Sequence, residues 1–310
     1  MSALGLGIDA GGTRTRWALA SPGGDIVGEG EVAGLTALQA RPDERERARA
    51  TLGLLARDVL AIGRPVRAHA GLTGFGDDAA EIRSLVAQPL GLPVDAVSAG
   101  TDVETAYRDL FAPGEGYLVY AGTGSIAAFI DAEGTLHRAG GRGVVLDDGG
   151  GGHWIAREAM RHVWRNEDER PGAWQSSPLA KEIFAVVGGA DWADSRRFVY
   201  GADRGEFGML ALAVARTADA DPAARAILSA AGVELARLAR ALEGRFGPRP
   251  VAVAGRVTEL HSRIAQAMRE ALPPGTDLRV CVSRGHHAAA RLAARAAQAN
   301  ETRCTDIARR

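Results

Sequence analysis

Residues 9–15 read Asp9-Ala10-Gly11-Gly12-Thr13-Arg14-Thr15 and stand between two short apolar runs, residues 4–8 and 17–20. The second run leads into the turn Ser21-Pro22-Gly23-Gly24, and residues 25–28 follow it. Short apolar runs separated by glycine-rich turns are typical of consecutive strands. The N-terminus therefore predicts a strand, a tight turn, a strand, a second turn and a third strand.

The same pattern returns later in the chain. Residues 116–121 are an apolar run, Gly122-Thr123-Gly124-Ser125 follows, and residues 126–130 predict the next strand. Gly11 aligns with Gly122, and Gly23 aligns with Gly134, without a gap. A repeat of this length indicates a duplicated domain, because the repeats of solenoid proteins are shorter. The alternative is a chance similarity between two glycine-rich hairpins.

Strands and helices alternate elsewhere, which favours an α/β fold with sheets covered by helices. Further strands are predicted at 67–71, 94–98 and 251–254, and helices at 78–88, at 103–111 and after Asp221-Pro222. We expect one domain over 1–112 and another over 113–310, with a helical insertion at about 154–246. A terminal helix at about 286–299 is a candidate to pack back on the first domain. The best candidate hinge is 109–115, which contains Pro113-Gly114.

Composition excludes several function classes. The formal net charge of −1 gives no basic footprint for nucleic acid or an anionic membrane. No stretch approaches the roughly 20 apolar residues of a membrane span, and no secretory signal is visible. Cys281 and Cys304 make neither a disulfide framework nor a metal-binding pattern. We therefore expect a cytoplasmic protein with small-molecule ligands.

Residues 9–15 have the chemistry of a phosphate-binding turn. Glycines allow backbone N–H groups to approach an anion closely, and Thr13 and Thr15 add hydroxyl donors. Asp9 is suited to hold a hydrated Mg²⁺. The alternative is a plain hairpin turn, which needs neither the carboxylate nor both threonines. The turn at 122–125 matches it, and neither is a Walker A loop or a Rossmann fingerprint, because each leads into a strand.

Asp102 follows the predicted strand at 94–98 and opens the predicted helix at 103–111. One interpretation is a plain helix N-cap, which is the commonest role of such an aspartate. The other is a general base, because the carboxyl end of a strand in an α/β protein is where ligands bind.

These motifs carry a family resemblance. Residues 8–15 resemble the first phosphate motif of the actin-like sugar kinases, and most of all the branch of the N-acetylglucosamine kinases and the BadF/BadG/BcrA/BcrD activator ATPases. Residues 120–127 are similar to that branch's second phosphate motif, and residues 140–155 to its sugar-site loop and following helix. Ala254-Gly255 resembles the start of the adenosine motif, and residues 205–242 the helical region. The resemblance covers nearly the whole chain.

The resemblance implies a duplicated actin-like, ribonuclease H-like ATPase fold with ATP and Mg²⁺ in the cleft between its halves. It implies that Asp9 positions Mg²⁺ and that Asp102 takes a proton from a sugar hydroxyl as that hydroxyl attacks the γ-phosphate. ATP would contact Gly11, Gly12, Thr13, Arg14, Thr15, Thr123, Gly124, Ser125 and Gly255. The sugar, a hexose or an amino sugar such as N-acetylglucosamine or glucosamine, would contact Thr36, Asp102, Gly141 and Asp148. A homodimer is an expectation at the level of the family.

Departures from the family pattern cluster on the sugar side. Ala37 follows Thr36 where these kinases carry asparagine, and Arg142 stands in place of a tryptophan. Gly149 replaces a glutamate in the run after the sugar loop, and Arg256 replaces the second glycine of the adenosine motif. Lost hydrogen-bond partners change substrate discrimination strongly. The sequence therefore predicts ATP binding more firmly than any particular acceptor.

Two rival functions remain open. An activator-type ATPase needs cysteine ligands for an iron–sulfur cluster, and Cys281 and Cys304 do not match the expected pattern. A non-catalytic sugar or nucleotide sensor is favoured by the altered sugar loop and opposed by Asp102. His286-His287 opens the terminal helix, and the pair is either a solvated helix end or a pair of metal ligands. We favour the solvated helix end, because adjacent helical residues point in different directions.

Overall fold

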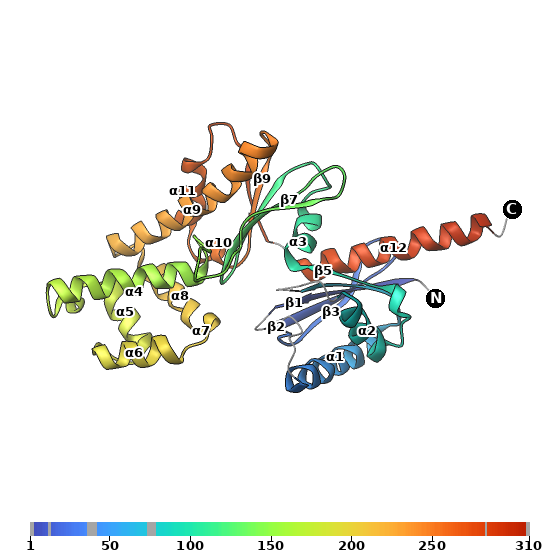
Figure 1. Cartoon of the computed structure of the whole chain (residues 1–310), viewed down its shortest axis with the longest axis horizontal. Helices are drawn as coiled ribbons and strands as arrows, with labels where there is room; N and C mark the ends of the chain where they lie inside the picture. The colour runs from blue at the N-terminus through green and yellow to red at the C-terminus, as the bar shows by residue number, and fades with distance from the viewer. Residues whose placement is uncertain (1–2, 12–13, 36–41, 73–78, 283, 308–310) are drawn as a thin grey trace. The chain divides into compact units, whose positions relative to one another are not determined.

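The computed structural model describes residues 3–11, 14–35, 42–72, 79–282 and 284–307. The chain divides into two compact units (Figure 1). Unit 1 consists of Met1–Leu110 and Ser283–Arg310, and unit 2 of Phe111–Val282. The sequence predicts the domain boundary at 112/113, two residues later, and makes a terminal helix at about 286–299 a candidate to pack back on the first domain. In the structure the terminal segment belongs to unit 1.

Unit 1 contains a five-stranded sheet in the order β3-β2-β1-β4-β5. Its strands are β1 (Leu4–Ala10), β2 (Arg14–Ala20), β3 (Ile26–Ala33), β4 (Pro65–Leu72) and β5 (Val97–Thr101). The first three strands are antiparallel neighbours, whereas β4 pairs parallel to β1 and β5 parallel to β4. The carboxyl ends of β1, β4 and β5 therefore meet at one edge of the sheet.

Helices cover both faces of this sheet. α1 (Pro42–Ile62) and α2 (Ala79–Leu90) enclose the main apolar core with Leu6 and Ile8 of β1. α12 (Gly285–Ile307) and α3 (Asp102–Leu110) pack on the opposite face. Gly7 permits this packing, because a Cβ placed there would lie 2.1 Å from the backbone nitrogen of Ala290 in α12.

Unit 2 contains a second five-stranded sheet in the order β10-β9-β6-β7-β8. Its strands are β6 (Tyr117–Ala121), β7 (Ser125–Ile130), β8 (Leu136–Gly140), β9 (Val251–Ala254) and β10 (Leu278–Cys281). Read from β8, the order repeats that of unit 1, with three antiparallel strands followed by two parallel ones. The predicted duplicated α/β fold is therefore confirmed.

Most helices of unit 2 come between β8 and β9 in the sequence. They are α4 (Gly152–Glu169), α5 (Pro178–Val187), α6 (Trp192–Gly201), α7 (Arg204–Gly208), α8 (Leu210–Thr217) and α9 (Pro222–Phe246), with the 3-10 turn η2 (Ala173–Ser176) after α4. α10 (Val257–Leu260) and α11 (Ser262–Ala271) follow β9. Asp221 caps α9 by accepting hydrogen bonds from the backbone N–H groups of Ala223 and Ala224 at 2.9 and 3.4 Å. This confirms the helix start predicted from Asp221-Pro222.

One predicted strand is partly wrong. Residues 94–96 form a 3-10 turn, η1 (Val94–Ala96), and β5 begins only at Val97. The turn forms because the N–H of Ala96 donates to the carbonyl of Pro93 at 3.0 Å. A run of small apolar residues does not by itself distinguish these conformations.

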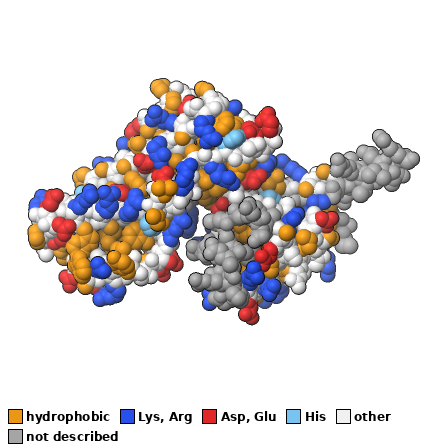
Figure 2. All heavy atoms as spheres, viewed as in Figure 1, with side chains coloured by type: hydrophobic (Ala, Val, Ile, Leu, Met, Phe, Trp, Pro, Cys, Tyr) orange, Lys and Arg blue, Asp and Glu red, His pale blue; other side chains and the backbone are white. Residues whose placement is uncertain are grey.

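The surface of unit 2 carries a group of exposed apolar side chains over α5, α6 and the region of α8 (Figure 2). Trp192 and Tyr200 are the most exposed aromatic members, and the Arg196 guanidinium lies over both rings, 4.8 and 4.7 Å from their centroids. Within the described ranges, no helix is both long enough and apolar enough to cross a membrane.

Candidate functional site

Two carboxylates lie near one another at the carboxyl-end edge of the unit 1 sheet. Asp9 is in register with Gly71 of β4, Gly71 is in register with Gly100 of β5, and Asp102 follows β5 directly. Burial, together with the smaller effect of the negative charge of Asp102, raises the pKa of Asp9 to about 6, against the opposing charge of Arg16. The structure thus brings together the predicted metal ligand and the predicted base.

Gly285 makes room for the Asp9 carboxylate at the start of α12. A Cβ at this position would lie 2.9 Å from Asp9 Oδ2, so any other residue would press on the carboxylate. Gly71 plays a similar part under α3, where a Cβ would lie 2.7 Å from the hydroxyl oxygen of Thr105. Both glycines shape the site, and neither could be predicted from the sequence because each contact joins distant segments.

Asp102 is not the residue that caps α3. The hydroxyl of Thr101 accepts a hydrogen bond from the backbone N–H of Glu104 at 3.0 Å, which is the usual bond of an N-cap. The Asp102 carboxylate accepts from the N–H of Val103 at 2.8 Å and is only partly buried. The plain N-cap interpretation of Asp102 is therefore wrong, because Thr101 fills that role.

His69 is a further residue of this edge that the sequence analysis missed. Its Nδ1 lies 2.9 Å from the Ser98 hydroxyl, and its Nε2 lies 3.2 Å from the Thr105 hydroxyl. The Thr105 hydroxyl donates in turn to the carbonyl of Thr101 at 3.1 Å. Burial is the main cause that lowers the pKa of His69, so the ring is neutral at neutral pH and ties the start of α3 to the sheet.

The turn between β1 and β2 is closed by the N–H of Gly11, which donates to the carbonyl of Arg14 at 3.0 Å. Arg14 is exposed and pairs with Glu31 at 3.3 Å. Thr15 is fully buried, and its hydroxyl accepts from the N–H of Leu35 at 3.0 Å, so it is not placed to contact a phosphate. The predicted ligands Gly12, Thr13 and Thr36 lie outside the described residues.

The turn between β6 and β7 is built on backbone hydrogen bonds. The N–H of Gly122 donates to the carbonyl of Gly124, and the N–H of His153 at the start of α4 donates to the carbonyl of Thr123, both at 2.9 Å. Ser125 is buried and donates its hydroxyl to the carbonyl of Gly149 at 2.7 Å. The predicted phosphate contact of the Ser125 side chain is therefore not supported, since the hydroxyl serves the loop.

Asp148 lies against this turn in unit 2. It has a positive φ of 56°, its carboxylate is buried, and Oδ2 pairs with Arg204 Nη2 at 2.6 Å. Its other oxygen accepts from the N–H of Gly143 at 3.3 Å. A Cβ at Gly124 would lie 2.3 Å from Asp148 Oδ2, so the glycine is needed for this approach. Arg204 is a site residue that the sequence analysis missed, although Asp203 and Glu206 mark the start of its helix.

Gly255 follows β9 with a φ of 104°, a conformation that favours glycine. A Cβ there would lie 2.3 Å from the carbonyl oxygen of Ala121, the residue before the glycine turn. The next residue, Arg256, is exposed and helical in conformation. Gly141 is exposed with a φ of 68°.

The reading of His286 and His287 as a solvated helix end is wrong. Both are buried, with 6% and 7% exposure, and both face Glu29 of β3. The packing of α12 on the sheet covers the start of the helix, which the sequence pattern of the helix alone does not reveal.

The sequence model of the BadF/BadG/BcrA/BcrD ATPase family matches residues 6–274. A comparison of the sequence with curated proteins finds no match.

Solved structures share the fold over nearly the whole chain. A "putative N-acetylglucosamine kinase" from Chromobacterium violaceum is 27% identical, with a TM-score of 0.72, and the match covers 94% of this chain and 99% of that one. A second protein of the same description, from Porphyromonas gingivalis, has a TM-score of 0.72 at 18% identity, over 96% and 99% of the two chains. A ROK family glucokinase from Streptomyces griseus, in complex with glucose and AMPPNP, has a TM-score of 0.60 at 19% identity, over 94% and 99%.

Proposed function

Because the chain belongs to the BadF/BadG/BcrA/BcrD ATPase family, we propose that it is an ATP-dependent sugar kinase. It transfers the γ-phosphate of ATP to a hydroxyl of a hexose or an amino sugar. The observation that carries this proposal is the carboxylate pair of Asp9 and Asp102 at the carboxyl ends of parallel strands in unit 1. Two solved structures with this fold are described as putative N-acetylglucosamine kinases, so N-acetylglucosamine and its relative glucosamine are the first acceptors to test.

Asp9 suits a divalent cation. Its pKa of about 6 reflects a buried carboxylate facing a second negative charge, and a cation would relieve both the burial cost and the repulsion. Mg²⁺ bound there would supply positive charge that neutralises the phosphate oxygens during transfer. In this role Asp9 binds and orients, and it forms no covalent bond.

Asp102 would act as the general base. A carboxylate at the first residue of α3 can accept the proton of a sugar hydroxyl as that oxygen attacks the γ-phosphorus. The Thr101 cap and the bonds from His69 to Thr105 hold this end of the helix in place. Such positioning matters because phosphoryl transfer depends mainly on alignment and charge stabilisation.

We assign the nucleotide to backbone groups more than to hydroxyls. Gly11 in unit 1, and Thr123 and Gly124 in unit 2, are the candidate phosphate contacts, since glycine-rich turns let N–H groups approach an anion. Arg14 remains a candidate only if it leaves Glu31. Gly255 has a positive φ that favours glycine, and the missing side chain leaves its backbone open, so it is the candidate contact for the adenosine.

The acceptor contacts proposed for unit 2 are Gly141 and Asp148. Asp148 already holds Arg204 at 2.6 Å, so its carboxylate would reach a sugar hydroxyl only together with, or in exchange for, that guanidinium. Arg204 thereby becomes a candidate specificity residue.

The test is ADP release by the purified protein with Mg-ATP and a panel of hexoses, amino sugars and N-acetylated sugars. A kinase releases ADP faster when its acceptor is present. Asp102→Asn should abolish the stimulated rate and leave ATP binding largely intact. ADP release that no sugar stimulates would argue for the activator-type ATPase instead, and ATP binding without turnover would argue for a sensor.

A further inference from the structure

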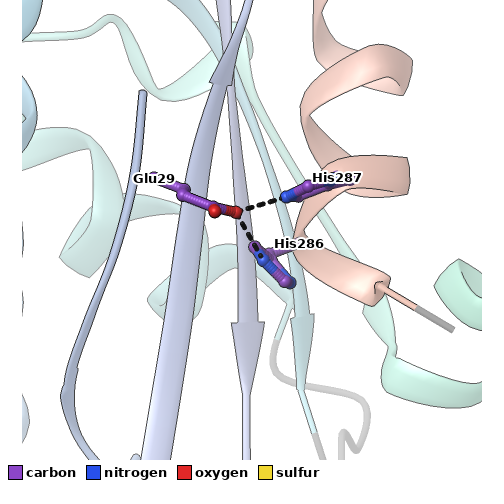
Figure 3. Close-up of side chains that lie close together, drawn as sticks. All are labelled: Glu29, His286 and His287. Carbon is purple, nitrogen blue, oxygen red and sulfur yellow. Dashed lines mark hydrogen bonds and ion pairs between the residues drawn. The ribbon is translucent and has the colours of Figure 1, made fainter. Parts of the chain in front are cut away.

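Glu29, His286 and His287 form a cluster in unit 1 that phosphoryl transfer does not use (Figure 3). Nε2 of His287 lies 2.5 Å from Glu29 Oε2, and Nε2 of His286 lies 3.4 Å from the same oxygen. The three potential ligand atoms all lie within 4.8 Å of one another. Two imidazole nitrogens therefore converge on one carboxylate.

The fold creates this cluster by leaving space above three adjacent strands. Glu29 of β3 is in register with Ala18 of β2, and Ala18 with Gly7 of β1, so only a methyl group stands beside Glu29 on that face. The first turn of α12 fills the space, and a Cβ at Gly7 would lie 2.2 Å from the carbonyl oxygen of His286. The close approach of helix and sheet thus turns both histidines toward Glu29.

His286 presents one ring nitrogen to the cluster, since its Nε2 lies 3.4 Å from Glu29 Oε2. Nδ1 of His286 is buried without a hydrogen-bond partner, which leaves Nε2 as the ring nitrogen that meets another group. Two nearby side chains of opposite charge act on the cluster. The positive charge of Arg16 disfavours a cation at His286, whereas the negative charge of Asp109 favours one at His287.

We propose that Glu29, His286 and His287 bind one divalent ion of the zinc class. Zinc is held at about 2.0 to 2.2 Å by imidazole nitrogen and carboxylate oxygen, usually in tetrahedral geometry, so two ligand atoms of one ion lie about 3.4 Å apart. Modest side-chain movements produce this spacing, and the side chain of Glu29, 54% exposed, is free to make them. Two histidines and one carboxylate leave further coordination positions for water on the exposed side of Glu29.

This site differs in chemistry from the one proposed at Asp9. Mg²⁺ prefers oxygen ligands and keeps several waters, whereas imidazole suits zinc, cobalt and nickel. An excess of Mg²⁺ therefore should not displace zinc from the histidines. The inference also stands apart from the proposed kinase activity, because none of the three residues takes part in transfer.

The bound ion would link α12 to β3, an edge strand of the sheet. Glu29 and His287 are 258 positions apart in sequence, and α12 starts where the chain re-enters unit 1 after unit 2. A ligand that binds only the folded state raises its stability in proportion to the logarithm of ligand concentration over Kd. Zinc should therefore raise the unfolding temperature of the chain, and this rise should depend on all three side chains.

The experiment uses the full-length chain, stripped of metal with a chelator and kept in excess Mg²⁺ without nucleotide. Co²⁺ is titrated while its visible absorption bands are followed, and Zn²⁺ is then added to displace it. Glu29→Gln and His287→Gln are compared with the wild type, and His162→Gln, an exposed histidine on α4 of unit 2, is the matched control. Glu29→Gln changes an exposed side chain of the same size, so it preserves the fold.

We expect the wild type and His162→Gln to bind one equivalent at the histidine cluster. Each ligand variant should bind the metal at least about tenfold more weakly, since even mutation of a group that only hydrogen-bonds to a ligand lowers metal affinity by that factor. Zinc should raise the unfolding temperature of the wild type and of the control, and should raise it less in the variants. The proposal is overturned if the wild type binds no Co²⁺ or Zn²⁺, or if both ligand variants bind as tightly as the wild type.

Discussion

Replacing Asp9 with asparagine should stabilise the protein while removing its activity. The pKa of Asp9 is raised from 3.8 to about 6 in the folded chain, because burial and the Asp102 charge both disfavour the carboxylate. The folded state therefore holds the Asp9 proton more tightly than the unfolded state does. Ionisation of Asp9 costs stability, and this cost grows as pH rises from about 4 to about 6.

The size of the effect follows from the shift. Each unit of pKa difference corresponds to about 1.4 kcal/mol, so the ionised carboxylate costs about 3 kcal/mol above pH 7. At pH 5 the same linkage gives an ionisation cost of roughly 1 to 2 kcal/mol, and below pH 3 this cost vanishes. Asparagine is an uncharged near-isostere of aspartate, so Asp9→Asn removes the ionisation cost.

The assay is urea unfolding of wild type and Asp9→Asn without nucleotide or divalent cation, at pH 5, 6, 7 and 8. The variant should gain stability over the wild type up to pH 7 and hold a constant advantage above it. Asp25→Asn, at an exposed position of unit 1, is the control and should stay within about 0.5 kcal/mol at every pH. A variant that is less stable than the wild type at pH 8, or a difference independent of pH, would refute the reasoning.

Three further predictions concern packing and the site. Gly7→Ala should lower the free energy of unfolding by roughly several kcal/mol, because its Cβ would meet the α12 backbone at 2.1 Å. Gly53→Ala in α1 should raise it by up to about 1 kcal/mol in the same urea titration, because a Cβ there meets nothing within 4 Å. Arg204→Met leaves the buried carboxylate of Asp148 without its guanidinium and should lower the free energy of unfolding by about 1 to 3 kcal/mol. In steady-state kinetics the same change should raise the KM for the sugar more than the KM for ATP. His69→Leu removes the bonds to Ser98 and Thr105, and should lower kcat about tenfold or more while the Kd for ATP, measured by calorimetry, stays within about twofold.

The sequence was a good guide wherever the signal was local. The two glycine-rich hairpins, the helix start at Asp221-Pro222 and the equivalence of the two halves all follow from short patterns. The strand orders of the two sheets confirm that equivalence. Asp102 could be placed at the end of β5 because the preceding run and the following helix are both visible in the sequence.

Contacts between distant segments could not be predicted in the same way. Asp148 and Arg204 are 56 positions apart, and nothing in either motif indicates that they pair. Thr15 and Ser125 look like phosphate ligands in the sequence, yet each hydroxyl serves a backbone group of a neighbouring loop. Whether a side chain points outward or inward at a hairpin depends on what packs around it, which the motif does not contain.

The histidine pair shows the same limit. The helical pattern of α12 predicts its existence, but the burial of its first turn depends on small residues in β1 and β2. The carboxylate that both rings face belongs to an outer strand near the other end of the chain. Only the folded sheet brings these groups together.

The most direct test of the central claim is to follow the γ-phosphate of ATP by ³¹P NMR with the acceptor that stimulates ADP release. For the wild type we expect a sugar phosphate signal that grows in step with ADP, and for Asp102→Asn we expect neither signal to grow while Mg-ATP still binds. Stoichiometric inorganic phosphate in place of the sugar phosphate, or a full rate in Asp102→Asn, would contradict the assignment.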